Sequence, residues 1–243
     1  MRIKILLILA AATALGGCVS PPQTPVSLST EILTNPESRV GIAMDTLPPA
    51  NLQLPGVSCL LCLAVASGAN SELSAHAKTL SMDEIIQLKA DVVSTLKNQD
   101  RETLVVDKPL LIDKLPKTKR LGAGYSKRDF SSYAEQYQLG HMIVIDINRV
   151  GMTRPYASYI LTGAAQAAVA GCVAMVDLKT NKYNWYLPID LYLSVDGEWD
   201  ESKDFPGLTN AYYQVLESLR DMVLSPLNTS PLKVAEVVSP TAK

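Results

Sequence analysis

The sequence has few residues suited to acid–base chemistry or metal binding at neutral pH. It contains only two histidines, His76 and His141, although histidine is the commonest side chain in both roles. A Ser or Cys triad needs a histidine beside the nucleophile, and the chain has no Gly-x-Ser-x-Gly turn. His141 begins an apolar run, where we expect a hydrogen-bonded structural residue. We therefore predict no catalytic residues, no bound metal and no cofactor.

The N-terminal hydrophobic run is also too short to span a membrane. Ile5–Leu15 follows two basic residues, Arg2 and Lys4, which is the pattern of a secretory signal peptide. The run ends in Leu15-Gly16-Gly17-Cys18, which resembles the lipobox of bacterial lipoproteins. That resemblance implies that residues 1–17 are a signal peptide and that Cys18 carries acyl chains such as palmitate. The alternative is an ordinary signal peptide with a chance cysteine.

The chain also lacks a clear excess of either positive or negative residues. The chain has 22 Lys and Arg residues against 24 Asp and Glu. Removal of residues 1–17 takes away Arg2 and Lys4 and leaves a balance of −4. The sequence shows no basic cluster, which argues against nucleic acid as a ligand. Val19 after the cysteine resembles enterobacterial lipoproteins that are sorted to the outer membrane, so we expect a lipid-anchored protein that faces the periplasm.

Prolines mark the two ends of the mature chain. Residues 18–39 hold the lipidated cysteine and four prolines among Ser, Thr and Gln, so we expect an extended tether that does not pack on the domain. Residues 225–243 contain three more prolines and no sustained period, which favours a loose C-terminal tail. Residues 40–224 then form the periplasmic domain, which is long enough for one hydrophobic core.

The domain is predicted to be organised around residues 140–149, with the sequence GHMIVIDINR. The β-branched apolar run is typical of a strand buried on both faces. A further strand is expected at Val40–Asp45. Ser81-Met82-Asp83-Glu84 resembles a capping box and predicts a helix over Asp83–Asn98. A short strand is predicted at Thr103–Asp107.

The second half of the domain is expected to contain helices on both sides of a hairpin. Residues 126–129 resemble a helix start, and Gly140 is the expected end of that helix. A hairpin should turn near Thr180-Asn181, and Pro188 should interrupt its second strand before residues 189–194. A last helix is predicted over Ala211–Leu224. The fold class is α/β, a single domain with a mixed parallel and antiparallel sheet and helices packed on it.

This order of elements resembles a known group of envelope proteins. The segments that carry the resemblance are VGIAMD, TLVVD, SYAEQYQLG, HMIVIDI and VDLKTNKYNWY. They are similar to the periplasmic domain of the curli-secretion lipoprotein, of the penicillin-binding-protein activator lipoprotein B and of the N-terminal domain of the Tol translocation protein. Leu139-Gly140-His141 departs from the aspartate-containing turn of that group. The resemblance covers about residues 40–224 and implies a domain that binds proteins or builds assemblies without catalysis.

Three cysteines remain besides Cys18, and they cannot all pair within one chain. Cys59 and Cys62 form a C-x-x-C pair, which in the periplasm allows a redox disulfide, a structural disulfide that also involves Cys172, or buried free thiols. The leucines between the first two cysteines are unlike a thioredoxin-type site. The sequence leaves the pairing open.

Two stretches are candidates for a partner surface. Tyr183, Trp185, Tyr186 and Tyr192 form an aromatic cluster that either packs in the core or anchors a partner. Strand alternation predicts that Tyr183 and Trp185 share one face and that Tyr186 lies on the other. Residues 54–69 carry no charge, and we favour burial or self-association there over contact with lipid.

The function predicted from the sequence is that of a non-enzymatic accessory or assembly factor of the cell envelope. Its partner is expected to be an envelope protein or another copy of the chain. The alternative is a subunit of an oligomeric secretion channel like the curli-secretion lipoprotein. That alternative requires amphipathic membrane hairpins, and residues 156–194 are the candidate segment.

Overall fold

A computed structural model describes residues 23–34, 39–119, 122–201 and 204–228. Cys18 and the lipobox lie outside the described residues. Within them the helices and strands are, in chain order, α2 (Thr30–Thr34), β1 (Val40–Met44), β2 (Asn51–Gln53), α3 (Leu60–Ala69), α4 (Ser71–Ala77), α5 (Asp83–Lys97), β3 (Thr103–Val105), η2 (Ile112–Lys114), α6 (Ser131–Tyr137), β4 (His141–Thr153), β5 (Tyr156–Ala157), β6 (Ile160–Leu161), β7 (Gln166–Asp177), β8 (Tyr183–Ser194), α7 (Pro206–Leu224) and η3 (Ser225–Asn228).

The sheet is mixed, and its strand order is β3-β1-β4-β7-β8. β4 is the central strand. Its first half pairs in parallel with β1, and its second half pairs in parallel with β2. Along almost its whole length β4 also pairs antiparallel with β7, which in turn pairs antiparallel with β8. The predicted α/β class with a mixed sheet is therefore confirmed, and β4 is the buried strand expected at residues 140–149.

Alternation along β4 divides the core between the two faces of the sheet. Ile143 and Ile145 point to the face covered by α5 and α7, and Met142 and Val144 point to the opposite face. All four side chains are buried, because the run has helices or loops on both sides. β4 therefore fixes the position of both layers.

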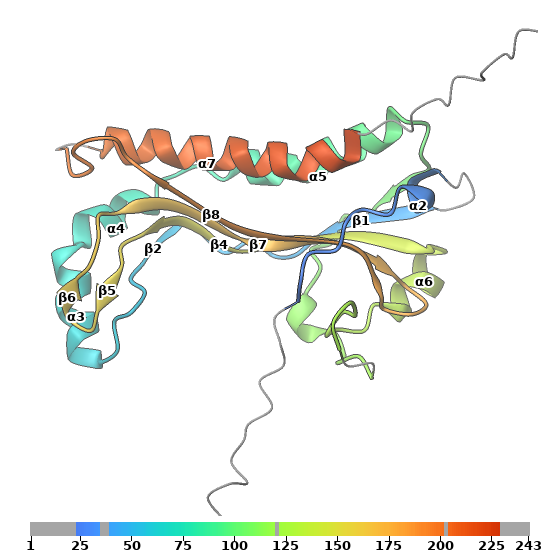
Figure 1. Cartoon of the computed structure of the whole chain (residues 1–243), viewed down its shortest axis with the longest axis horizontal. Helices are drawn as coiled ribbons and strands as arrows, with labels where there is room; N and C mark the ends of the chain where they lie inside the picture. The colour runs from blue at the N-terminus through green and yellow to red at the C-terminus, as the bar shows by residue number, and fades with distance from the viewer. Residues whose placement is uncertain (1–22, 35–38, 120–121, 202–203, 229–243) are drawn as a thin grey trace, which may run out of the picture.

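Figure 1 shows how the layers are arranged. α5 and α7 lie across one face of the sheet, and two lobes project from the ends of the other face. The first lobe contains α3, α4 and the β5–β6 hairpin. The second contains α6 and the loops between β3 and β4. In the part of the chain that is described, no helix combines the length and apolar character needed to cross a bilayer.

The prediction that residues 18–39 do not pack on the domain is wrong for residues 23–34, which the structure describes. Val26 forms a two-way backbone bridge with Tyr186 on β8, with N···O distances of 3.0 and 2.9 Å, and Leu33 is buried. The open edge of β8 offers unpaired backbone groups, and this segment satisfies some of them. The tail prediction is wrong at its start, because Leu227 is buried and its carbonyl accepts a hydrogen bond from Gln99. Residues 229–243 lie outside the described residues.

Pro188 does not interrupt the second strand of the hairpin, contrary to expectation. β8 is an edge strand, and the N–H of Tyr186 points outward to the carbonyl of Val26. Two residues further along, the nitrogen of Pro188 faces the same outer edge, where no hydrogen bond to β7 is lost. β8 therefore runs unbroken from Tyr183 to Ser194.

Candidate functional site

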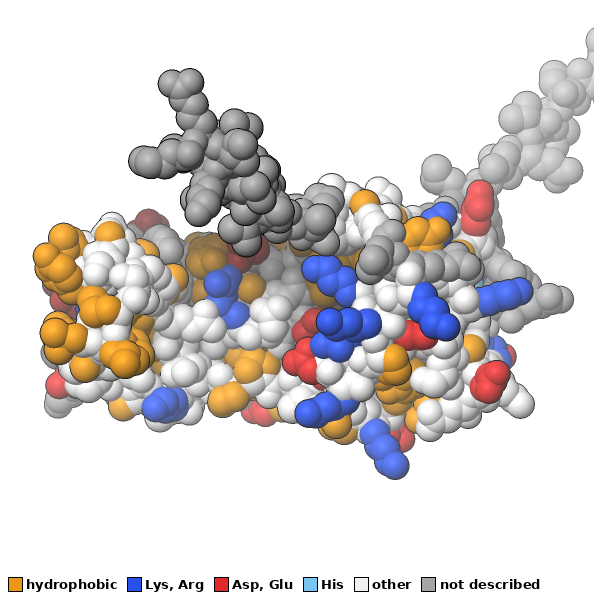
Figure 2. Space-filling view, turned by 90° about the horizontal axis from the view of Figure 1, so that it is seen from below, with side chains coloured by type: hydrophobic (Ala, Val, Ile, Leu, Met, Phe, Trp, Pro, Cys, Tyr) orange, Lys and Arg blue, Asp and Glu red, His pale blue; other side chains and the backbone are white. Residues whose placement is uncertain are grey.

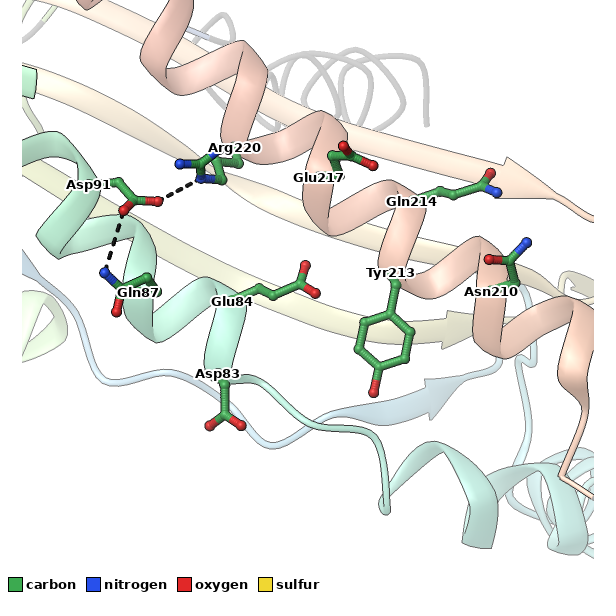
Figure 3. A pocket seen from close by; sticks show the side chains of 9 residues that line it. All are labelled: Asp83, Glu84, Gln87, Asp91, Asn210, Tyr213, Gln214, Glu217 and Arg220. Carbon is green, nitrogen blue, oxygen red and sulfur yellow. Dashed lines mark hydrogen bonds and ion pairs between the residues drawn. The ribbon is translucent and has the colours of Figure 1, made fainter.

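A hollow of the described surface lies between the outward faces of α5 and α7. Both helices bury an apolar stripe against the sheet, with Leu88 and Val92 on α5 and Val215 and Leu219 on α7. Their remaining faces rise side by side and leave a groove of about 600 Å³. We call this the α5–α7 groove. Its lining side chains are Asp83, Glu84, Gln87, Asp91, Asn210, Tyr213, Gln214, Glu217 and Arg220, shown in Figure 3.

One end of the groove is closed by a link between the helices. Arg220 Nε donates to Asp91 Oδ2 at 2.6 Å, and the other carboxylate oxygen of Asp91 accepts from Gln87 at 3.4 Å. These bonds are the dashed lines in Figure 3. The Asp91 carboxylate raises the pKa of the Arg220 guanidinium through the hydrogen bond and its charge. The guanidinium of Arg220 is therefore already paired with the carboxylate of Asp91.

Tyr213 is the aromatic side chain of the groove. Its side chain points from α7 toward α5 in Figure 3, and its exposed fraction is 36%. Behind it Tyr212 is fully buried, meets the Tyr213 ring edge-on at 5.2 Å and donates its hydroxyl to the carbonyl of Ser81 at 2.9 Å. Burial, then Tyr213 and Glu84, raise the pKa of Tyr212. Tyr213 thus packs against a buried neighbour and remains partly exposed in the groove.

The groove is negatively charged. Its lining contains four carboxylates, from Asp83, Glu84, Asp91 and Glu217, and one cation, Arg220. Amide side chains and the phenol of Tyr213 supply further donors and acceptors. Such a surface can bind a positively charged segment through ion pairs at its rim and an aromatic contact at its centre. Sequence reasoning did not find this site, because its two helices are separated by more than a hundred residues of chain.

The predicted aromatic cluster is divided between the two faces of the sheet. Trp185 is 2% exposed and packs in the core under α7. Tyr183 and Tyr186 lie together on the opposite face, with ring centroids 4.9 Å apart. The prediction that Tyr183 shares a face with Trp185 is wrong, because a bulge shifts the register between Trp185 and Tyr183. Of the four residues, Tyr192 alone is exposed, at 44%.

Tyr192 lies at the edge strand beside a charged pair. Arg149 Nη2 donates to Asp190 Oδ1 at 2.5 Å and to the hydroxyl of Tyr192 at 2.6 Å, and its guanidinium carbon lies 5.0 Å from the centre of the Tyr192 ring. This trio belongs to the face away from α5 and α7. It does not contribute to the α5–α7 groove.

Cys59 and Cys62 form a disulfide, and Cys172 is a free cysteine. Cys172 lies opposite Asp146 on β4. Burial, with a smaller effect from the Asp146 charge, raises the pKa of the Cys172 thiol to about 12. The thiol is therefore protonated at neutral pH, which removes the thiolate that nucleophilic or redox chemistry needs.

The two histidines do not meet. His76 contacts Thr209 Oγ1 through its Nε2 at 2.7 Å, whereas His141 begins β4, where burial lowers its pKa against an opposing effect of Asp177. Within the described residues, no group of His, Cys, Asp and Glu is arranged to hold a metal ion. Both histidines occupy packed structural positions.

No protein-family model matches the chain, and no curated protein is significantly similar to it in sequence. The fold defines a single α/β domain. The α5–α7 groove is an acidic hollow on its helical face.

Proposed function

We propose that the protein is a lipoprotein anchored through Cys18 in the outer membrane and exposed to the periplasm. Its α/β domain serves as a non-enzymatic accessory or assembly factor that binds an envelope protein. The α5–α7 groove takes a positively charged segment of that partner. The observation that carries this proposal is the groove itself, whose lining includes Tyr213, 36% exposed, and four carboxylates, of which only Asp91 is paired with Arg220.

Two features of the groove favour a protein as its ligand. It is an open surface between helices, whereas sites for small molecules enclose most of their ligand. Tyr213 also has the properties of an interface anchor, because it is large, held from behind by Tyr212 and polar at its tip. The carboxylates speed the encounter with a basic partner and exclude acidic ones.

The groove is tested by capture of the partner from mildly cross-linked cells. The bait is the full lipidated protein, and the size of the complex is measured in the same experiment. We expect one dominant envelope protein at a fixed ratio. Charge reversal by Glu84→Lys together with Glu217→Lys should weaken that complex at least tenfold. Tyr213→Ala should weaken it to a similar degree.

Glu135→Lys is the matched control, because Glu135 is an exposed glutamate on α6, on the other face of the sheet. It should leave the complex unchanged. Equal capture by the groove variant and the wild-type protein would overturn the groove as the partner site. The anchor is tested separately, since Cys18→Ser should abolish incorporation of labelled palmitate and release the protein from membranes.

A subunit of an oligomeric secretion channel is the alternative function. It requires a hairpin that is free to leave the domain and enter a membrane. The upper faces of β7 and β8 instead pack beneath α7, with Val173 and Trp185 buried there. Self-complexes of fixed size, without another envelope protein, would favour this alternative.

A further inference from the structure

The first lobe carries hydrophobic side chains that the fold does not bury. On α3, Leu60 is 88% exposed, Leu61 75% and Val65 57%. On the β5–β6 hairpin, Tyr159 is 68% exposed, Ile160 57% and Leu161 43%. We call these six residues the apolar tip. Figure 2 shows hydrophobic side chains gathered at this end of the molecule. Of the burial and self-association favoured for residues 54–69, burial is contradicted along most of α3, whereas self-association, which needs an exposed surface, is not.

α3 is unusual because it is apolar on nearly all sides and yet lies at the surface. Among its ten residues only Cys62 and Ala66 are buried. A helix of this composition is normally found inside a protein core or a membrane. Solvent-exposed groups of apolar side chains commonly mark a contact surface.

The apolar tip is held in place. The disulfide between Cys59 and Cys62 brackets Leu60 and Leu61. Cys62 Sγ contacts Ser158 Oγ at 3.3 Å, and the backbone N–H of Ser158 donates to the carbonyl of Gly56 at 2.9 Å. These contacts join α3 to the hairpin, so the six hydrophobic side chains form a preorganised surface.

The second lobe combines positive charge from two parts of the sequence. Residues 114–128 contain six basic residues and no acidic one, and the β7–β8 turn brings two more lysines close by, because Tyr125 bridges to Lys182. The exposed lysines of residues 114–128 and of the β7–β8 turn are Lys114, Lys117, Lys119, Lys127, Lys179 and Lys182. The interpretation that the chain has no basic cluster is therefore wrong for the folded domain.

Both lobes and Gln23 lie on the same side of the sheet, whereas Leu33, further along the N-terminal segment, packs in the core on the face of α5 and α7. The lobes project away from α5 and α7 in Figure 1. Figure 2, seen from below, shows the hydrophobic end and the Lys and Arg side chains together on that face. Gln23 belongs to the same side, because its side-chain oxygen accepts the N–H of Gly124 at 2.8 Å in the second lobe.

The length of chain before Gln23 limits how far this face can be from an anchor. Five peptide steps separate Cys18 from Gln23. At about 3.5 Å per residue they span at most about 18 Å. An acylated Cys18 therefore keeps the second lobe next to the membrane surface.

We propose that this face docks directly on an anionic bilayer, with the apolar tip inserted among the lipids and the lysines of the second lobe over the headgroups. The proposal rests on the lipid anchor of the proposed function and adds a second contact with the membrane. Apolar insertion and attraction of lysine to anionic lipid are the two forces that bind peripheral proteins to a bilayer. The α5–α7 groove then faces away from the membrane and toward the periplasm.

The test uses the full mature chain with Cys18→Ser, so that no acyl chain contributes. The protein is floated with vesicles of three parts phosphatidylcholine to one part phosphatidylglycerol. We expect it to float with the vesicles and to be released by high salt. Leu61→Glu should reduce the bound fraction about tenfold or more. Lys117→Glu should reduce it about fivefold and weaken its dependence on salt.

Each variant has a control on the helical face. Ile86→Glu introduces the same charge at a 58% exposed isoleucine of α5, and Lys97→Glu reverses an exposed lysine of that helix. Both should bind vesicles like the parent protein, and circular dichroism checks the fold of every variant. Absence of flotation, or equal binding by Leu61→Glu and Ile86→Glu, would overturn the proposal.

The same protein variants distinguish membrane docking from self-association through the apolar tip and from the lipid anchor. If the apolar tip binds a second copy instead, sizing shows a dimer that Leu61→Glu dissolves, with no flotation, and the membrane proposal is overturned. Failure of palmitate labelling at Cys18 would overturn the anchor and leave the flotation result unchanged, so failure of the anchor and failure of the docking face are distinguishable.

Discussion

Asn181, in the turn between β7 and β8, fastens the start of α6 through Asp129. Its side-chain nitrogen donates to Asp129 Oδ1 at 2.8 Å, and its side-chain oxygen accepts the backbone N–H of Phe130 at 2.8 Å. Asn181 is 7% exposed and has a φ of 57°, a conformation that asparagine tolerates better than most residues. The backbone of Asn181 thus belongs to the hairpin turn, and its side chain positions the start of α6 in the second lobe.

The first prediction concerns Asn181→Ala. The change leaves the N–H of Phe130 without its side-chain acceptor and puts alanine in a left-handed conformation. We expect the free energy of unfolding to fall by about 2–3 kcal/mol, measured by urea denaturation. Asn98→Ala, at an exposed asparagine after α5, should change it by less than about 0.5 kcal/mol. Equal effects would contradict the structural role of Asn181.

The second prediction concerns Asp146, whose carboxyl lies on β4. Burial, then the charges of Asp45 and Asp113, raise its pKa from 3.8 to about 6. The folded protein therefore holds this proton more tightly than the unfolded chain. The carboxyl costs stability above pH 6, by about 3 kcal/mol at most, and the cost disappears as the pH falls toward 4.

Asp146→Asn should remove the contribution of this carboxyl to the pH dependence of the free energy of unfolding. The unfolding free energy of the variant should exceed that of the wild-type protein at pH 7.5, and the gap should close between pH 6 and pH 4. Denaturant titrations across this range measure it. Asp107→Asn, at an exposed aspartate, should follow the wild-type curve. A gap that does not change with pH would contradict the effect of burial on Asp146.

The third prediction uses two glycines with different surroundings. Gly151 has a φ of +124°, and a Cβ there would lie 2.3 Å from the carbonyl oxygen of Asn51 on β2. Gly151→Ala should therefore disrupt the β2–β4 pairing and lower the free energy of unfolding by about 1–3 kcal/mol or more. Gly68→Ala, on α3 with nothing within 4 Å, should stabilise by up to about 1 kcal/mol. Thermal unfolding that ranks the two variants the other way would contradict the β2–β4 geometry.

The sequence predicted those strands, helices and turns that depend on a few neighbouring residues. The apolar run of β4, the helical spacing of Ile85, Leu88 and Val92, and the turn at Thr180-Asn181 are each a property of a few adjacent residues. The α/β class follows from their order. Capping details were less predictable. Ser81 accepts the N–H of Asp83 rather than forming the expected box, and α6 ends with Gln138 in a left-handed conformation rather than with Gly140.

Features that depend on distant parts of the chain could not be predicted. The α5–α7 groove exists because two helices meet on one sheet. The basic run of residues 114–128 is visible in the sequence, but its proximity to Lys179 and Lys182 of the hairpin turn depends on the fold. The bulge between Tyr183 and Trp185 places Tyr183 on the face of the sheet opposite to Trp185. α3 has the composition of a buried helix, and its exposure follows from its place at the end of the sheet.

The last prediction concerns the disulfide between Cys59 and Cys62. It closes a ring with a sequence separation of only 3, so it restricts the unfolded chain little, and its reduction should lower the free energy of unfolding by about 2 kcal/mol at most. The effect should be concentrated in α3, because Cys59 Sγ accepts the N–H of Cys62 at the start of that helix. Hydrogen exchange should accelerate over residues 59–69 on reduction, while β4 and α7 stay protected. Cys172→Ser should not alter the response to reductant, since Cys172 is not part of the bond. Loss of protection across β4 would show instead that the disulfide supports the central sheet, and would contradict its assignment as a local clamp on the apolar tip.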